Sequence, residues 1–273
     1  MEKVNIIVIG AGRMAEAIVA GLLQHKREDV GRIVITNRSR RERLQELKNR
    51  YRVEVAHTWQ EEIGEADVVL LAIPPTEHHE VLDALAPYIT KQLVITIAGG
   101  IGLTPLTERL PSGTAVAWIM PNTAAQIGES ISPFTMNNVD QLQRSWVELL
   151  VGGIGSGVEC TEQEVINLTA ITGSAPAFIY RIAEVLGGLT EERGIEPETG
   201  RRLVAQMIYG TSKMLMQEGE PAQLREQVTS PGGSTAAGLQ SLEDHGFEKI
   251  FCEAIRATDR RAYELTNANG EST

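Results

Sequence analysis

Cysteine is scarce in this 273-residue chain. The two cysteines, Cys160 and Cys252, lie far apart and form no CxxC pair. Isolated cysteines of this kind indicate reduced thiols in a cytoplasmic protein, although the sequence alone leaves a disulfide open. We therefore expect neither a disulfide-stapled fold nor an oxidising compartment.

Long apolar segments are also lacking. No run approaches the roughly 20 residues that a membrane-spanning helix needs, so we expect no membrane partner. The N-terminus enters a strand-like segment directly, without a charged leader followed by an apolar core. We accordingly expect no secretory signal.

Positive charge is in deficit, with 25 Lys and Arg against 36 Asp and Glu and a net charge of −11. An acidic surface repels the phosphates of nucleic acids and anionic lipids, so neither is expected as a partner. His78 and His79 have no further ligand at metal-binding spacing, and we expect no metal site. Residues 152–157 are rich in glycine but lack the Lys-Ser/Thr of a Walker loop, which indicates a flexible turn.

A glycine-rich turn follows the first predicted strand. Residues 4–9 form a nearly continuous apolar run, typical of a buried parallel strand, and a helical pattern begins at Ala15. Between them the spacing is G-x-G-x-x-A: Gly10 makes the tight turn, Gly12 lets the backbone approach a pyrophosphate, and Ala15 lets helix and strand pack closely. Because a second strand follows, the motif predicts a dinucleotide-binding site.

The end of the second predicted strand indicates which dinucleotide binds. A site for NAD usually has an acidic residue there, whereas this chain has Asn37-Arg38-Ser39 followed by Arg40 and Arg41. A guanidinium and a hydroxyl suit a 2′-phosphate, so we expect NADP(H), with NAD(H) as the alternative. A second interpretation is that the arginines are only the solvated start of a helix over 40–50, although a helix N-terminus disfavours clustered positive charge.

Strands and helices alternate over the first part of the chain. This alternation predicts a Rossmann-type, doubly wound parallel sheet, which binds its ligand at the carboxyl ends of the strands. These ends are residues 10–12, 37–39, 72–75, 98–100 and 121–122. We expect all five to converge on one cleft.

From about residue 162 long helical patterns replace the strands. The composition, 42% hydrophobic and 22% charged, is that of a soluble globular protein long enough for two domains. We expect a dinucleotide-binding domain over residues 1–161 and an all-α domain over 162–273. The apolar stripe over 203–216 is broad, which suggests that these helices pack against another subunit.

A proline-glycine turn precedes one of the later helical patterns, with the sequence Val228-Thr229-Ser230-Pro231-Gly232-Gly233-Ser234-Thr235. Free backbone N–H groups and hydroxyls at a helix start can hold a small anion such as a carboxylate. The alternative is an ordinary capped loop between two helices, and the residues of the turn by themselves favour that alternative.

Lysine is absent between Lys91 and Lys213. Dehydrogenases that act on alcohols usually need a general acid or base, commonly His or Lys, and related hydroxyacid dehydrogenases place a lysine on the first helices of the second domain. The gap favours a hydride acceptor that brings its own proton. A protonated cyclic imine does so, because it is already activated and needs only to be held against the nicotinamide.

Taken together, the motifs resemble the pyrroline-5-carboxylate reductase family, which makes proline, over nearly the whole chain. The resemblance rests on the G-x-G-x-x-A and Asn-Arg-Ser motifs, on Met120-Pro121-Asn122-Thr123, on residues 169–177 and above all on residues 228–235. It implies NADPH-dependent, sometimes NADH-dependent, reduction of 1-pyrroline-5-carboxylate to L-proline. It also implies a helical domain that interlocks in a homodimer, with dimers that often assemble into decamers.

The resemblance further implies roles for individual residues. Backbone N–H groups of the turn would hold the substrate carboxylate, and the hydroxyl of Thr235, the implied catalytic residue, would orient the ring nitrogen. The implied substrate-binding residues are Glu218, Gln227, Ser230, Gly232, Gly233, Ser234 and Thr235. The implied cofactor-binding residues are Gly10, Ala11, Gly12, Arg13, Met14, Asn37, Arg38, Ser39, Ala72, Ile73, Pro74, Pro75, Ala98, Gly99 and Asn122.

The sequence also departs from the family pattern. Pro74 stands where the family usually has lysine, and Ala124 replaces the proline that usually follows Asn-Thr. Ala175 replaces a common glycine, Gly99 replaces a common alanine, and Trp59 replaces a common asparagine. The departures leave two rival functions open. One is a reductase for another cyclic imino acid, and the other is a non-catalytic NADP-binding regulator derived from the family.

Overall fold

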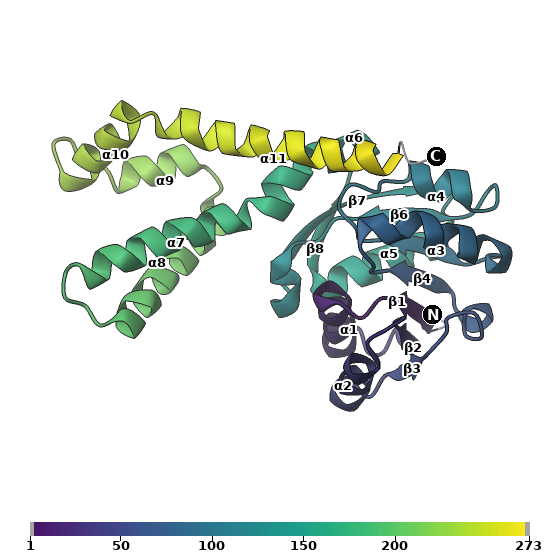
Figure 1. Cartoon of the computed structure of the whole chain (residues 1–273). Helices are drawn as coiled ribbons and strands as arrows, with labels where there is room; N and C mark the ends of the chain where they lie inside the picture. Colours follow the sequence, from purple (N-terminus) through teal and green to yellow (C-terminus); the bar gives the residue numbers. More distant parts are fainter. Residues whose placement is uncertain (1–2, 271–273) are drawn as a thin grey trace. The chain divides into compact units, whose positions relative to one another are not determined.

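The computed structural model describes residues 3–270, and the side chains of Glu218 and of residues 265–270 lie outside that description. The chain divides into two compact units (Figure 1). The first extends to Ser174 and also includes the end of the last helix, from Thr258; the second is Ala175–Ala257. The change from strands to helices expected near residue 162 falls inside the first unit, which continues through a helix and a π-helical turn.

An eight-stranded sheet forms the centre of the described part of the first unit, in the order β3-β2-β1-β4-β5-β6-β7-β8. β1 to β6 run parallel, and the chain crosses from one side of β1 to the other between β3 and β4. This crossing is the topological switch point of a doubly wound fold, so the predicted Rossmann-type class is confirmed. The strands are β1 (Val4–Ile9), β2 (Val30–Thr36), β3 (Glu54–Ala56), β4 (Val68–Leu71), β5 (Leu93–Thr96), β6 (Val116–Ile119), β7 (Ser130–Asn137) and β8 (Gly155–Glu159).

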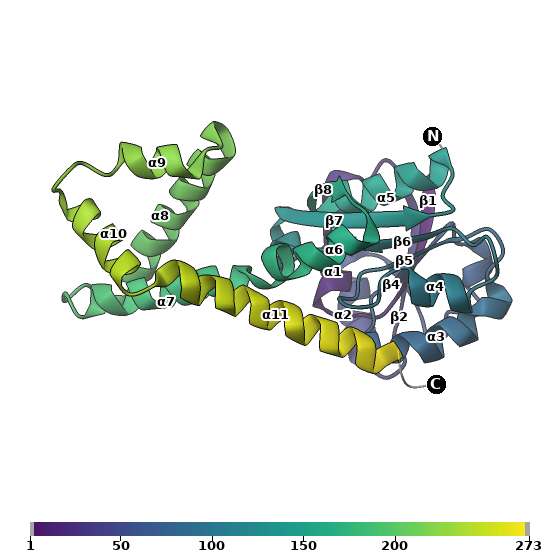
Figure 2. The same ribbon diagram turned by 90° about the horizontal axis from the view of Figure 1, so that it is seen from above.

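Helices cover both faces of this sheet (Figure 2). One face packs against α1 (Arg13–His25), α2 (Arg41–Tyr51) and α5 (Gln141–Ile154), and the other against α3 (His78–Leu85), α4 (Thr104–Arg109) and α6 (Glu162–Leu168). Because strand residues alternate between faces, Ile6 and Val8 join the first core and Ile7 and Ile9 the second. Burial on both faces explains why the strands are continuously apolar in sequence.

The last two strands of the sheet are not predicted by the sequence pattern. β7 runs antiparallel to β6, and β8 pairs with β7 at the edge. The flexible turn expected over residues 152–157 is wrong, because this segment holds the end of α5 and the start of β8. Glycine serves packing here: a Cβ on Gly21 of α1 would lie 2.1 Å from the carbonyl oxygen of Gly153, so α1 and α5 meet backbone to backbone.

The second unit is helical over its described residues. It contains α7 (Pro176–Glu191), α8 (Pro197–Glu218), α9 (Pro221–Gln227), α10 (Ser234–Asp244) and the first part of α11 (Phe247–Gly270). α7 and α8 form a hairpin, and the Phe178 ring lies edge-on to Phe251 with centroids 5.9 Å apart. Many large apolar side chains remain exposed, such as Tyr180 at 59% and Leu203 at 55%. The broad apolar stripes predicted for these helices are therefore present and largely uncovered within one chain.

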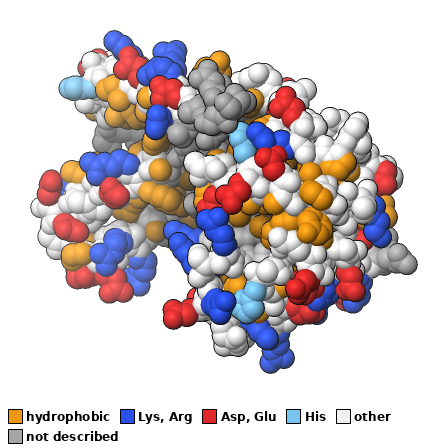
Figure 3. Space-filling model, turned by 45° about the vertical axis from the view of Figure 1, so that its right-hand side comes forward, with side chains coloured by type: hydrophobic (Ala, Val, Ile, Leu, Met, Phe, Trp, Pro, Cys, Tyr) orange, Lys and Arg blue, Asp and Glu red, His pale blue; other side chains and the backbone are white. Residues whose placement is uncertain are grey.

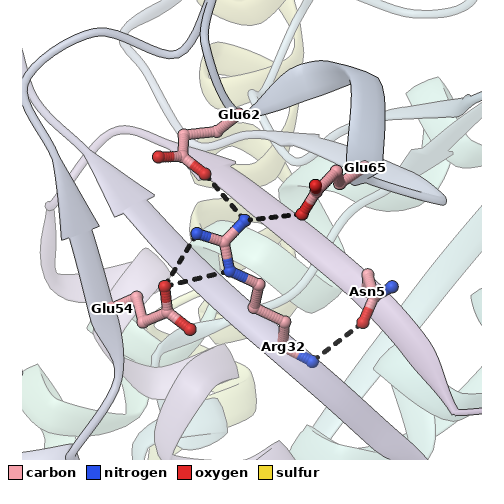
Figure 4. A network of polar contacts seen from close by, with 5 residues as sticks. All are labelled: Asn5, Arg32, Glu54, Glu62 and Glu65. Atoms are coloured by element: carbon pink, nitrogen blue, oxygen red, sulfur yellow. Dashed lines mark hydrogen bonds and ion pairs between the residues drawn. The ribbon is translucent and has the colours of Figure 1, made fainter.

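A cluster of ion pairs centres on Arg32 of β2 (Figure 4). Its guanidinium donates to Glu54 of β3 through Nε and Nη2, at 2.9 and 2.7 Å, and pairs through Nη1 with Glu62 at 2.7 Å and Glu65 at 3.4 Å. Its backbone N–H donates to the Asn5 side chain on β1 at 2.9 Å. The hydrogen bond from Arg32 holds the pKa of Glu54 below its ordinary value. The Arg32 guanidinium thus links β2 and the edge strand β3 to the segment that precedes β4.

We expect Arg32→Gln to lower the free energy of unfolding by about 1 kcal/mol, because three carboxylates lose their shared counter-ion. The depressed pKa of Glu54 means that this contribution is present above the ordinary carboxyl pKa of 4.5 and is lost as the pH falls through the lower folded value. Urea unfolding at pH 7 and pH 3.5 measures both effects. Arg144→Gln, which breaks a pair with the single carboxylate of Glu159, is the control and should cost less; an equal loss contradicts the shared-cation account.

Candidate functional site

A cleft of about 590 Å³ lies at the carboxyl ends of β1, β2 and β4. Much of the predicted cofactor set lines it: Gly10, Ala11, Gly12, Asn37, Arg38, Ser39, Ala72, Ile73 and Pro74. The remaining walls come mainly from the segment after β3 and from α3, with His57, Thr58, Trp59, Gln60, Glu77, Glu80 and Val81. Apart from Trp59, these wall residues were missed from the sequence. The signal available for residues 57–60 was the short alternating run Val53-Glu54-Val55-Ala56 directly before them, which is typical of a strand.

Gly10 fixes the base of the cleft. Its φ of +117° is a backbone conformation that L side chains rarely adopt, and an added Cβ would lie 2.2 Å from the carbonyl oxygen of Ala72. Its N–H donates to the carbonyl of Thr36 at 2.9 Å. The tight turn predicted at this residue therefore brings together the ends of three adjacent strands.

Gly12 forms the open side of the same turn. It is the N-cap of α1, with no side chain capping the helix, and an added Cβ would meet nothing within 4 Å. The first turn of a helix has N–H groups without intrahelical acceptors and carries partial positive charge. A bare helix start facing an open cleft is suited to hold an anion.

Arg38 also lines the cleft, from the turn between β2 and α2. Asn37 shapes this turn, because its side-chain oxygen accepts from the backbone N–H groups of Ser39 at 3.1 Å and Arg40 at 2.8 Å. The Arg38 guanidinium is exposed, and its Nη1 lies 3.6 Å from Oε1 of Glu80 on α3. A weak, exposed pair of this kind leaves Arg38 available for a stronger anion.

A buried hydrogen-bond chain supports the loops that end β4 and β5. His78, fully buried, donates from Nδ1 to the Pro74 carbonyl at 3.1 Å, so in the neutral ring Nε2 accepts from the Thr96 hydroxyl at 2.8 Å. The Thr96 oxygen accepts from the Ala98 N–H at 3.2 Å, and the Ala98 carbonyl accepts from the Trp118 indole at 3.0 Å. Burial lowers the pKa of His78 below its ordinary value of 6.5, which keeps the ring neutral.

Several predicted cofactor residues lie next to the cleft lining rather than in it. Arg13 and Met14 start α1 directly after Gly12, and Pro75 begins a short 3-10 turn after Pro74. Ala98, Gly99 and Asn122 follow β5 and β6, and they are not among the residues that line the 590 Å³ cleft. Of the five strand ends expected to converge on one cleft, those of β1, β2 and β4 line it and those of β5 and β6 do not; the end of β3, which was not expected there, also lines it.

The end of β6 is organised by Asn122. Its side-chain oxygen accepts from the Ala124 N–H at 2.9 Å, and its side-chain nitrogen donates to the Thr172 carbonyl at 3.1 Å. Proline at position 124 could not make the first bond, so this departure adds a contact that proline lacks. Ala175 has an ordinary φ of −59°, so glycine is not required there.

The proline-glycine turn belongs to the second unit. Gly232 has a φ of +72°, and Gly233 is the N-cap of α10 with no side-chain cap, its own N–H donating to the Ser230 carbonyl at 2.9 Å. None of the four hydroxyls of the turn caps α10, so the turn joins α9 to a helix start that has no side-chain cap. Ser234 and Thr235 are exposed in the first turn of α10, Gln227 ends α9, and the predicted Glu218 side chain lies outside the described residues.

Charges of both signs are interspersed on the face shown in Figure 3. Among residues 3–270, no helix combines the length and the apolar character needed to cross a membrane. Within the same described part, no group of three or more His, Cys, Asp or Glu side chains is placed to hold a metal ion.

Comparison with known families gives two matches. A model described as pyrroline-5-carboxylate reductase dimerisation matches residues 162–265, and one described as NADP oxidoreductase, coenzyme F420-dependent, matches residues 5–100. Pyrroline-5-carboxylate reductase 2 of Bacillus subtilis is 36% identical over 267 residues, covering 97% of this chain and 95% of the relative. The pyrroline-5-carboxylate reductase of Staphylococcus aureus is 33% identical over 270 residues, covering 98% and 100%.

Solved structures show the same similarity. A pyrroline-5-carboxylate reductase from Coxiella burnetii superposes with a TM-score of 0.88 at 31% identity, covering 97% of this chain and 99% of that one. Pyrroline carboxylate reductase from Plasmodium falciparum, solved with NADP bound, superposes with a TM-score of 0.86 at 27% identity and the same coverage.

The neutral state of His78 predicts a specific pH dependence. Because its folded pKa is below 6.5, the contribution of His78 is fully present above 6.5 and is lost as the pH falls towards the folded value. We expect the free energy of unfolding to fall by up to about 1.4 kcal/mol per pH unit in that window through this one group. Urea unfolding between pH 7.5 and 5 should show a shallower slope for His78→Gln than for the wild type; identical slopes for the two proteins contradict the assignment.

Proposed function

Because the chain belongs to the pyrroline-5-carboxylate reductase family, we propose that it reduces 1-pyrroline-5-carboxylate to L-proline with NADPH. The observation that carries this proposal is similarity over the full length, at 36% identity across 97% of the chain. Both the dinucleotide half and the helical half of the relatives are therefore present in this chain.

The residues of the first unit fit a dinucleotide phosphate. Gly12 leaves open space beside the uncapped start of α1, where a pyrophosphate would receive backbone N–H groups. Arg38 and Ser39 line the cleft after the end of β2, where a guanidinium and a hydroxyl suit a 2′-phosphate. The nicotinamide, when bound, supplies a hydride to the carbon of the substrate C=N bond.

The turn over residues 228–235 is the proposed substrate site. Of the backbone N–H groups around Gly232, Gly233 and Ser234, that of Gly233 donates to the Ser230 carbonyl and shapes the turn, and the other two hold the carboxylate. The Thr235 hydroxyl orients the ring nitrogen. The exposed, uncapped start of α10 supports this assignment. Ser230 lies in the turn, Gln227 ends α9 directly before it, and Glu218 completes the proposed set. No general acid is needed, since the imine enters protonated and the hydride converts it to the secondary amine.

The proposal includes the assembly and location of the enzyme. Self-association is supported by the match to a dimerisation domain and by the uncovered apolar side chains of α7 and α8. We propose that dimers assemble further into decamers. Residues 1–161 bind the cofactor, and residues 162–273 bind the substrate and the partner subunit. Nucleic acid is not a partner in this proposal. The free thiols of Cys160 and Cys252 support a cytoplasmic location.

The function is tested by following NADPH absorbance with 1-pyrroline-5-carboxylate. We expect turnover, and we expect Thr235→Ala to lower kcat/KM by roughly 10- to 100-fold, the loss of one hydrogen bond to a charged group, with NADPH affinity unchanged. Thr235→Ser, which keeps the hydroxyl, is the control and should retain most of the rate.

The same assay distinguishes the two rival functions, a reductase for another cyclic imino acid and a non-catalytic NADP-binding regulator. Faster turnover of the six-membered cyclic imino acid would assign the enzyme to that ring. A folded protein that binds NADPH but turns over neither ring would favour the non-catalytic regulator.

Cofactor preference is expected to depend on Arg38. Arg38→Gln should weaken NADPH binding by roughly 10- to 100-fold and leave NADH binding nearly unchanged, because only NADPH carries the 2′-phosphate. Glu80→Gln, which frees Arg38 from its partner, should shift the preference the other way. Fluorescence titration of both cofactors measures the ratio, with Arg41→Gln, an exposed arginine outside the cleft lining, as the matched control. The assignment is wrong if Arg38→Gln weakens both cofactors alike.

A further inference from the structure

Arg43 of α2 does not point into the cleft with Arg38 but packs behind the glycine turn. Its Nε–H donates to the carbonyl oxygen of Ala11 at 3.3 Å. Its Nη2 donates to the carboxylate of Glu16 in the first turn of α1, and its Nη1 pairs with Glu46 at 2.6 Å. All three guanidinium nitrogens are therefore engaged, and the side chain is only 22% exposed.

Glu16 anchors this arrangement from α1. It accepts from Arg50 at 3.1 Å and from the Tyr51 hydroxyl at 2.9 Å as well as from Arg43, and its side chain is 17% exposed. Partial burial acts to raise the pKa of the Glu16 carboxyl, but the hydrogen bonds from Arg43 and Tyr51 and the two positive charges outweigh it and hold the pKa below its ordinary value. The anchor is thus a carboxylate at neutral pH, fixed by three donors from α2.

The contact with Ala11 bears on the direction of a neighbouring N–H group. In a planar trans peptide the C=O of Ala11 and the N–H of Gly12 point in opposite directions. Holding the carbonyl from the α2 side therefore fixes the direction of the Gly12 N–H. This peptide unit turns about ψ of Ala11 and φ of Gly12, and glycine rotates more freely than other residues, so a side chain that holds the Ala11 carbonyl removes part of that freedom.

We propose that Arg43 is a positioning residue for the pyrophosphate site: by binding the Ala11 carbonyl while anchored on Glu16, it holds the glycine turn in the conformation that presents its backbone N–H groups to the dinucleotide. The inference rests on the proposed cofactor. It assigns no direct contact between Arg43 and the cofactor, so it applies to NADP and NAD alike, unlike the role of Arg38.

The test compares Arg43→Met with Arg50→Met by calorimetric titration of the full-length protein. Both variants remove one positive charge from α2 and one partner from Glu16, but only Arg43 contacts Ala11. The ligands are NADP⁺, NAD⁺ and 2′-AMP, which keeps the adenosine 2′-phosphate but has no pyrophosphate. We expect Arg43→Met to weaken NADP⁺ and NAD⁺ by a similar factor of about 10, as for the loss of one charge-assisted hydrogen bond, with 2′-AMP unchanged. Arg50→Met should leave all three affinities unchanged.

Three results would overturn the inference: wild-type NADP⁺ affinity in a folded Arg43→Met protein, an equal weakening of 2′-AMP, or the same loss in Arg50→Met. If Arg43→Met does not fold, Arg43→Lys replaces it. Lysine keeps the charge but cannot place donors at the separate Nε and Nη2 positions, so weakened NADP⁺ binding supports the inference and full affinity overturns it. Because the readout is nucleotide binding, a protein that binds NADP⁺ but does not reduce the imine refutes the proposed function and leaves this inference standing.

Discussion

The close approach of Gly10 to the backbone of Ala72 is the constraint on which the dinucleotide cleft depends. A single added methyl group would lie 2.2 Å from the Ala72 carbonyl oxygen, in a chain segment whose φ of +117° already disfavours any side chain. That approach lets β1 and β4 end side by side while the Gly10 N–H binds Thr36 at the end of β2. The cleft opens where these three ends meet, so its position follows from one residue without a side chain.

The start of α1 poses an electrostatic problem that α2 resolves. A carboxylate in the first turn, Glu16, stabilises the helix through its dipole but would oppose an anion bound at the same end. Arg43 neutralises it, and partial burial of both side chains makes this contact stronger than the pair that Glu16 forms with the exposed Arg50. The arginines that follow β2 therefore divide into two groups. Arg38 and Arg40 line the cleft, whereas Arg43 packs behind the glycine turn, against the Ala11 carbonyl. The helix-start interpretation and the phosphate interpretation of this run each describe part of it.

Local patterns predicted much of the first unit because they depend on neighbours in sequence. The glycine turn, the apolar runs of β1, β2, β4, β5 and β6, and the long helices after residue 175 appear where the sequence indicates them. β7 and β8 were missed, since their sequences mix serine, glycine and proline with few apolar residues and their pairing depends on distant strands. Likewise, residues 152–157 look flexible by composition, yet their glycines allow α1 and α5 to touch. The contacts of Arg43 with Ala11 and of His78 with Thr96 join segments far apart in sequence, and no spacing rule signals them.

The stability of the second unit depends on how much apolar surface it buries rather than on local backbone geometry. No described side chain of α7 is buried, and Val204 is the buried large apolar residue in α8. Since removal of apolar surface from water is the main term that stabilises a small helical unit, a surface beyond this chain must supply part of that burial. The first unit, by contrast, covers both faces of its sheet with its own helices. The proline-glycine turn lies in the unit that depends on self-association, and the glycine turn of β1 in the unit that does not. Assembly is therefore expected to govern the proposed substrate site more strongly than the dinucleotide cleft.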